Sequence, residues 1–218
     1  MQLLYAMNTM SYEDILEKNI LTNDFSKRTK DIMCLLFVRP ATDSGNKILS
    51  SLNYYHFSSG NKIDFYLPGY YTDSSQKYTN EDAPVKVDDE NWYYSDEAFV
   101  KIKEHLEDES KWEYSGESEL LVFKYTNGRL NFDNVILFKL DQMMRDEAIV
   151  SYDNFFESFF KLFKNEYDLN KISNILGGKG AIATLIDEIL SKLPLNLGKL
   201  YKREKYFSVL NLRLNNLY

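Results

Sequence analysis

The sequence predicts an α/β protein whose mixed sheet contains a βαβ unit and an antiparallel hairpin, and whose C-terminal third is helical. Three observations support this fold class. Residues 31–38 form a run of strand length that is apolar throughout after Asp31, an Asn-Gly pair separates two strand-like runs near residue 127, and phenylalanines recur at helical spacing after residue 151. An α+β arrangement is the alternative reading of the same elements.

The composition is that of a globular chain with a core of its own. The chain has 218 residues, of which 44% are hydrophobic and 27% are charged. This length is enough to bury a sizeable core without disulfides or metals. We therefore expect an α/β sheet core in residues 1–145 and a helical part in residues 146–218, packed together as one domain.

The βαβ unit is predicted between residues 31 and 67. The run "DIMCLLFV" at 31–38 lacks polar alternation, which favours a strand buried on both faces of the sheet. A helix is expected over 45–57, with Ser44 as its N-cap, because its apolar residues recur every three or four positions. A second strand, "KIDFYL" at 62–67, completes the unit.

The middle of the chain adds a helix and a hairpin. Ser95 is followed by two acidic residues and an apolar stripe, which predicts a helix with Ser95 as its N-cap. The runs "SELLVFKY" and "RLNFDNVILFKL" flank Asn127 and Gly128, a strong signal for a two-residue hairpin turn.

The C-terminal third shows helical periodicity. Ser151 is a predicted N-cap, and a second helix is expected over 181–193. The tail at 206–218 alternates apolar and polar residues, which suits an edge strand as well as a helix. A strand there would complete this chain's own sheet or pair with a partner. One helical face should carry Phe155, Phe156, Phe159, Phe160 and Phe163, and the tail alternation rests on Leu210, Leu212 and Leu214.

Charge and targeting signals narrow the class of protein. The net charge is −7, and residues 72–119 alone carry 15 Asp or Glu against five Lys, whereas residues 199–218 carry five Lys or Arg against one Glu. The high negative charge of residues 72–119 argues against general binding to a phosphate backbone, and we do not expect a nucleic-acid partner. No signal-peptide pattern and no membrane-length apolar run is present, and the single cysteine, Cys34, cannot form an internal disulfide. We expect a cytoplasmic protein without a membrane association.

The best candidate site follows the first predicted strand. Ligands of open α/β sheets bind at the carboxyl ends of the strands, where Arg39 stands. The loop after Arg39 leads into a helix N-terminus, whose unpaired N–H groups attract anions. Two tyrosines follow the second strand and should reach the same edge. The sequence thus predicts a site for a nucleotide or another small anion, formed by Arg39, Thr42, Ser44, Gly45, Tyr70 and Tyr71.

Each of these residues also has a purely structural interpretation. Arg39 could pair with a carboxylate such as Asp43, and Ser44 could serve only as a helix cap. His56 should lie at the opposite edge of the sheet, because it is near the end of the crossover helix, and we expect no function for it. With His56 and His105 far apart, a zinc site is not expected, although a magnesium or calcium site made of carboxylates alone stays open.

One stretch of the sequence resembles proteins that are associated with a particular kind of genomic locus. Residues 35–71, with "LLFVRP" and "IDFYLPGYY", resemble uncharacterised bacterial proteins associated with phage-defence loci, over about a sixth of the chain. The resemblance implies no activity. The strand–loop–helix start and the later "SDEAF" helix are also similar to TIR-like domains, which implies a glutamate near the carboxyl edge. Glu97 and Glu117 are the candidates for it.

Two functions follow as expectations. The first is a non-enzymatic binding or accessory subunit of a multi-component bacterial system, working with a protein partner or as a homo-oligomer, because no catalytic motif fits its predicted context. The alternative is an enzyme or sensor, TIR-like or a similar α/β protein, that handles a nucleotide at the Arg39 edge. The sequence assigns no catalytic residue and no cofactor.

Overall fold

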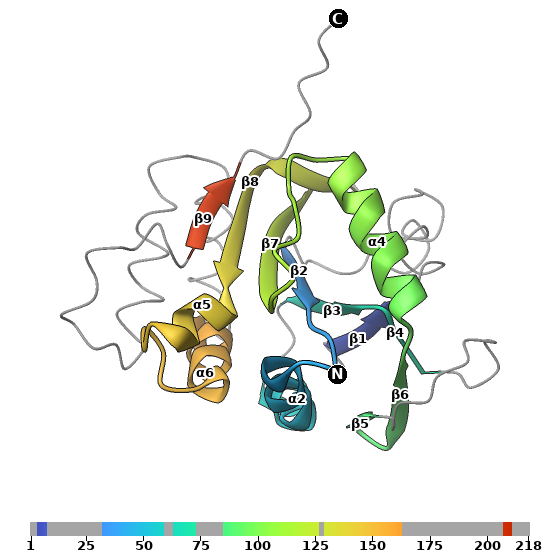
Figure 1. Ribbon diagram of the computed structural model, residues 1–218, viewed down its shortest axis with the longest axis vertical. Helices are drawn as coiled ribbons and strands as arrows, with labels where there is room; N and C mark the ends of the chain where they lie inside the picture. The colour runs from blue at the N-terminus through green and yellow to red at the C-terminus, as the bar shows by residue number, and fades with distance from the viewer. Residues whose placement is uncertain are drawn as a thin grey trace, which may run out of the picture.

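A six-stranded mixed sheet forms the centre of the protein (Figure 1). The computed structural model describes residues 4–7, 32–58, 63–72, 85–126, 129–162 and 207–210, and the structural statements below concern those residues. The strand order is β1-β3-β2-β7-β8-β9. The bounds are Leu4–Met7 for β1, Ile32–Phe37 for β2, Asp64–Pro68 for β3, Glu119–Thr126 for β7, Arg129–Lys139 for β8 and Phe207–Leu210 for β9.

The sheet combines parallel and antiparallel pairing, which confirms the predicted fold class. Strands β1 and β2 both pair with β3 in parallel, whereas β2–β7, β7–β8 and β8–β9 are antiparallel. The hairpin of β7 and β8 is the one expected around Asn127 and Gly128, although these two turn residues lie outside the described residues.

Two short helices, rather than one, connect β2 to β3. They are α2 (Asp43–Ser50) and α3 (Leu52–Ser58), separated at Ser51. The prediction that Ser44 is the N-cap of the first of these helices was wrong. Thr42 has the extended backbone of a cap, and its hydroxyl accepts from the Gly45 N–H at 3.0 Å. Both hydroxyls have the chemistry of a cap, so only the backbone geometry distinguishes them.

A small second sheet and a long helix follow β3. Strands β4 (Tyr70–Tyr71), β6 (Glu90–Tyr94) and β5 (Val85–Val87) form an antiparallel sheet in that order. Helix α4 (Asp96–Asp108) begins where expected, since the Ser95 hydroxyl accepts from the Ala98 N–H at 3.1 Å.

Two helices follow the hairpin. They are α5 (Leu140–Arg145) and α6 (Tyr152–Leu162). The prediction that Ser151 caps α6 is confirmed, since its hydroxyl accepts from the Asn154 N–H at 3.1 Å. Strand β9 pairs with β8 of the same chain. The residues expected at Phe163, in the 181–193 helix and at Leu212 and Leu214 lie outside the described residues.

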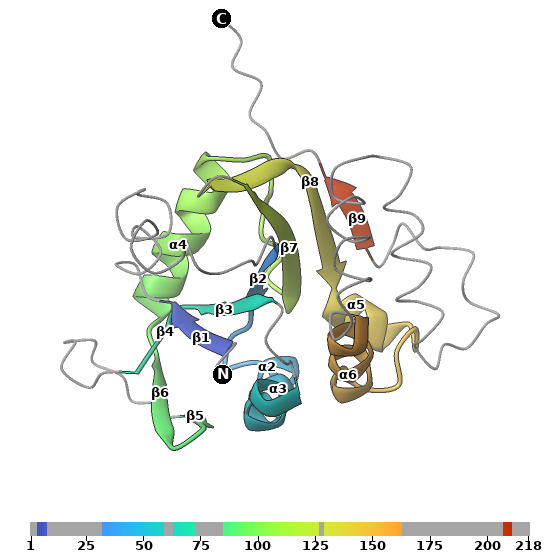
Figure 2. The same cartoon turned by 180° about the vertical axis from the view of Figure 1, so that it is seen from behind.

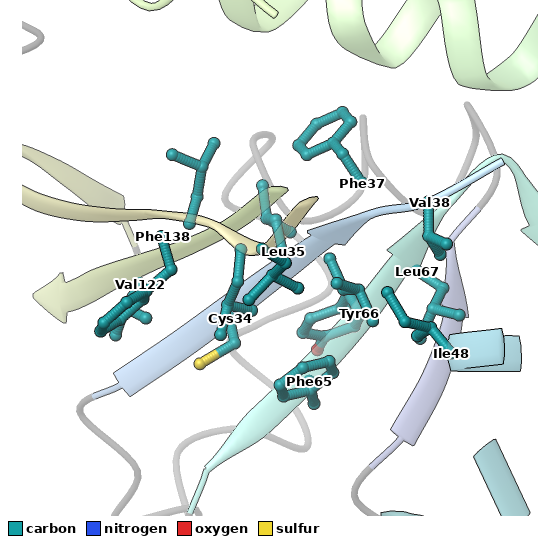
Figure 3. Packing of buried hydrophobic residues seen from close by; sticks show 14 of the residues in the cluster. Cys34, Leu35, Phe37, Val38, Ile48, Phe65, Tyr66, Leu67, Val122 and Phe138 are labelled. Atoms are coloured by element: carbon teal, nitrogen blue, oxygen red, sulfur yellow. The ribbon is translucent and has the colours of Figure 1, made fainter. Parts of the chain in front are cut away.

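Helices cover both faces of the sheet, which explains the unbroken apolar run of β2. Phe37 of β2 packs against Phe99 of α4, with ring centroids 5.6 Å apart. Cys34, an odd number of residues away, points to the other face beside Phe65 (Figure 3). There Phe65 contacts Phe156 and Phe160 of α6. Figures 1 and 2 show α4 on one side and α2, α3 and α6 on the other. None of the described helices is long and apolar enough to span a membrane.

Candidate functional site at the carboxyl edge of the sheet

The edge predicted from the sequence brings together several ends of elements. Strand β2 ends at Phe37, which stands opposite Glu119, the first residue of β7. Glu119 in turn stands opposite Lys139, the last residue of β8. The start of α2 lies at the same edge, because α2 follows β2 after a short loop. The start of α4 also lies there, because the Ser95 N–H donates to the carbonyl of Gly69, the residue after β3. The ends of β2, β3 and β8 and the starts of α2, α4 and β7 thus meet at one edge.

The guanidinium of Arg39 lies over two aromatic rings at this edge. Its guanidinium carbon is 4.6 Å from the ring centroid of Phe99 and 6.0 Å from that of Tyr114. Its Nε is 3.3 Å from Asp96 Oδ1, so the carboxylate beside Arg39 is Asp96 at the start of α4. The Arg39 side chain as a whole is 33% exposed, whereas its Nε is buried.

The loop between Arg39 and α2 is closed by its own hydrogen bonds. The Thr42 hydroxyl donates to the Arg39 carbonyl at 3.0 Å while it caps the Gly45 N–H. A Cβ built on Gly45 would lie 1.8 Å from that carbonyl oxygen. Only glycine permits this close approach of the helix start to the end of β2.

Ser44 belongs to a cluster centred on Asp141. Asp141 Oδ2 accepts from the Ser44 hydroxyl at 2.9 Å and from the Ser118 N–H at 3.1 Å, and Oδ1 accepts from the Tyr152 hydroxyl at 3.0 Å. The Ser118 hydroxyl donates to Ser44 Oγ at 3.0 Å. Burial first, and Asp141 next, raise the pKa of Tyr152 above its ordinary value, so Tyr152 remains a donor. One carboxylate thereby joins α2, α5, α6 and the residue before β7.

The two predicted tyrosines are buried rather than open to a ligand. Tyr70 is fully buried, and its hydroxyl donates to the Val38 carbonyl at 3.4 Å. Tyr71 stacks on Tyr93 with ring centroids 5.7 Å apart. Tyr70 also packs against Tyr94, whose ring centroid is 5.2 Å away and whose hydroxyl donates to Asp96 at 2.8 Å.

Glu119 is a buried carboxyl group that the sequence reading did not single out. It is 1% exposed, and Trp112 Nε1 donates to its Oε2 at 3.2 Å. Burial raises the pKa of Glu119, and hydrogen bonds from Ser115 and Trp112, together with the charge of Lys139, offset part of that rise. Its position at the first residue of an apolar strand was the only sequence signal available.

The other candidates have ordinary structural partners. Glu97 pairs with Lys101 at 2.6 Å, and Glu117 forms a bidentate pair with Arg145 at 2.7 and 2.9 Å. His56 is buried at the end of α3, with its ring edge-on to Phe57. No group of three or more His, Cys, Asp or Glu side chains suited to a metal occurs among the described residues.

Comparison with known proteins identifies no relative: no protein-family model, no curated protein and no solved structure matches this chain.

Proposed function

We propose that the protein is a non-enzymatic binding or accessory subunit of a multi-component bacterial system. The observation that carries the proposal is the way the polar groups at the carboxyl edge bind one another. The hydroxyls of Ser44 and Tyr152 both donate hydrogen bonds to Asp141, and the Tyr70 hydroxyl donates one to the Val38 carbonyl. A ligand at these groups would have to break hydrogen bonds that already exist.

The Asp141 carboxylate opposes a second anion at the start of α2. It already lies beside Ser44, where the predicted phosphate or carboxylate of a ligand would bind. A second negative group at that position would be repelled. The hydrogen bonds of Asp141 instead link α2, α5, α6 and the residue before β7, as expected in a scaffold that presents a binding surface.

The surface of α3 supplies apolar area suited to a protein partner. Tyr54 and Phe57 are 48% and 65% exposed, although both are large apolar side chains. Aromatic side chains are enriched among the residues that dominate binding energy at protein interfaces. The bacterial setting and a role in phage defence are supported by the resemblance of residues 35–71, and a cytoplasmic location belongs to the same proposal.

Affinity purification from the source cells tests the proposal. A tagged wild-type chain should co-purify with a defined partner, or run as a homo-oligomer in light scattering. The double variant Tyr54→Ser, Phe57→Ser should lose that association while staying folded. The matched control is Glu104→Ser, Asp108→Ser, which changes two exposed positions of α4 and should bind as the wild type does. Equal recovery with all three chains would contradict a partner site on α3.

A nucleotide-handling function is the second candidate, and Arg39 is the observation that favours it. The guanidinium of Arg39 lies over the Phe99 ring and the side chain as a whole is 33% exposed, and guanidinium N–H groups are strong donors to phosphate. Calorimetry with ATP, GTP and NAD separates the two functions. Binding by the wild type that Arg39→Ala abolishes would support this candidate, whereas equal affinities would remove Arg39 from it.

A further inference from the structure

Helix α3 is apolar on the side that faces solvent as well as on the side that faces the sheet. Its inner side buries Leu52, Tyr55 and His56, whereas its outer side exposes Tyr54 and Phe57. A surface helix ordinarily carries polar residues on its outer side. Of the three large apolar side chains that are exposed in the described part of the chain, two therefore lie on one turn of this helix.

Both exposed rings are supported from behind by a buried ring. The Tyr54 ring lies edge-on to Tyr55 with centroids 6.1 Å apart, and the Phe57 ring lies edge-on to His56 with centroids 5.4 Å apart. Tyr55 is fixed in turn by its hydroxyl, which donates to Asp153 Oδ1 at 2.6 Å. A partner that binds here meets rings that are already ordered, which lowers the entropic cost of binding.

Acidic segments lie on both sides of the exposed rings. At about 100° per residue around the helix, the rings lie on the arc that runs from Asn53 to Tyr55. Asn53 Oδ1 accepts from the Asp88 N–H at 2.9 Å, so the turn between β5 and β6 lies at one end of this arc. The hydrogen bond from Tyr55 to Asp153 places the first turn of α6 at the other end. Figure 2 shows α3 between β5 and α6.

The charges around the rings are predominantly negative. Residues 88–90 are all acidic, and the lysines of β5 and α6 are already paired with neighbouring carboxylates at 3.7 and 2.6 Å. Among the described residues, Asp88 and Glu90 have no cationic partner. Helix α2 adds Asp43 and Lys47, whose charges cancel. The α3 patch consists of Tyr54, Phe57, Asp88, Glu90 and Asp153.

The same protein holds one of its own guanidinium groups with this combination of groups. Arg39 places its guanidinium carbon 4.6 Å from the Phe99 ring centroid and its Nε 3.3 Å from Asp96 Oδ1. A planar guanidinium can stack on a ring and donate to a carboxylate at the same time, whereas an ammonium group cannot stack as a plane. The α3 patch offers two rings and three carboxylates, and it therefore fits arginine side chains.

We propose that the α3 patch binds an arginine-rich segment of a partner protein, whose guanidinium groups stack on Tyr54 and Phe57 and pair with the carboxylates on either side. The inference rests on the proposed function, since it names the chemistry of the partner that the binding subunit recognises. A neutral apolar partner would desolvate the carboxylates without compensation. A second copy that presented the same patch would bring like charges together.

Fluorescence anisotropy with labelled peptides measures this binding. The probes are a short peptide in which arginine alternates with serine, and its counterpart with lysine in place of arginine. The wild-type chain should bind the arginine peptide, and the lysine peptide about threefold or more weakly. Both affinities should fall as the salt concentration rises. No binding of the arginine peptide, or equal affinities for the two peptides, would overturn the inference.

Two double variants and a matched control locate the site. Asp88→Asn, Glu90→Gln removes two charges and should weaken binding of the arginine peptide about tenfold. Asparagine also tolerates the positive φ of 51° at position 88. Replacing both exposed rings with serine should weaken binding by a similar factor. The control Glu104→Gln, Asp108→Asn removes the same charge from exposed positions of α4 and should bind as the wild type does. Equal weakening in this control would reduce the binding to general attraction of a cation by an acidic protein, and would overturn the inference. Circular dichroism checks that each variant is folded.

Affinity purification separates this inference from the proposed function. A partner that is lost when the rings are replaced but kept by Asp88→Asn, Glu90→Gln would support the proposed function and overturn the arginine assignment. Loss in both variants would support both. Recovery of neither a partner nor an oligomer with the wild-type chain would contradict the proposed function, and the peptide titration would still decide whether the patch binds arginine. A wild-type dimer that only the ring replacement dissociates would assign α3 to a second copy and overturn the inference.

Discussion

The Ser44 hydroxyl donates to Asp141 Oδ2 at 2.9 Å across 97 residues of chain. Ser44 lies in the first turn of α2, which follows β2, and Asp141 lies in the first turn of α5, which follows β8, so the bond connects the parallel half of the sheet to its antiparallel half. The same carboxylate also accepts from the Ser118 N–H and the Tyr152 hydroxyl, so one side chain joins α2, α6 and the residue before β7.

Removing the Asp141 carboxylate should destabilise the whole fold. Asp141→Ala leaves three partly buried donors without their acceptor, and we expect a loss of about 2–4 kcal/mol in the free energy of unfolding. Asp141→Asn keeps an acceptor oxygen and should lose about half as much. Urea unfolding measures both. Asp43→Ala, at an exposed acidic position of α2, is the control and should change stability by about 0.5 kcal/mol. A similar loss in Asp43→Ala and Asp141→Ala would refute the special role of Asp141.

The stacking of Arg39 should matter more than its ion pair. Asp96 is 65% exposed, and exposed pairs contribute about 0–1 kcal/mol. The contact with Phe99 adds cation–π attraction and buried methylene groups. Arg39→Ala should therefore lower the thermal midpoint more than Asp96→Asn does, and Arg39→Lys should fall between them because ammonium cannot stack as a plane. Scanning calorimetry gives the order, and the reverse order would make the ion pair dominant.

The substitution Gly45→Ala should lower the stability of the protein, although Gly45 lies inside helix α2. Alanine normally stabilises a helix by about 1 kcal/mol relative to glycine. At Gly45, however, the new methyl group would meet the Arg39 carbonyl oxygen at 1.8 Å, and we expect a net loss of about 3 kcal/mol. Gly116→Ala, where the added atom meets nothing within 4 Å but φ is +88°, should cost only about 1 kcal/mol. Chemical unfolding compares the two, and a stabilised Gly45→Ala chain would mean that the loop adapts without strain.

Deleting the tail tests whether β9 serves this chain or a partner. Removal of residues 206–218 takes away the strand that pairs with Val135–Phe138 of β8. We expect a lower melting temperature in the monomer, by roughly 5 °C or more, because a ladder of the central sheet is lost. The shorter deletion of residues 212–218 keeps β9 and is the control. Loss of oligomerisation with an unchanged melting temperature would instead assign the tail to an interface.

Local chemistry in the sequence was enough to predict the main elements. The apolar run that became β2 has no polar alternation, and a strand covered by helices on both faces is the structure that such a run satisfies. The cap at Ser95, the cap at Ser151 and the β7–β8 hairpin were also predictable, because each depends on residues adjacent in the chain. For the same reason, the placement of Arg39 at the end of β2 followed from the sequence.

Long-range contacts decided what the side chains at that edge do. Ser44 was expected to cap a helix, but Thr42 has the extended backbone of the cap, and Ser44 turns to a carboxylate from the end of β8. Asp96 rather than Asp43 lies beside Arg39, because the chain after β3 carries the start of α4 back to β2.

The hydrophobic pattern of the sequence therefore determined which segments form strands and helices and which faces they bury. The partners of Asp141, Arg39 and Glu119 arose only in the tertiary structure. Their positions depend on strand order and register, which bring together residues up to 97 positions apart and which no local pattern encodes.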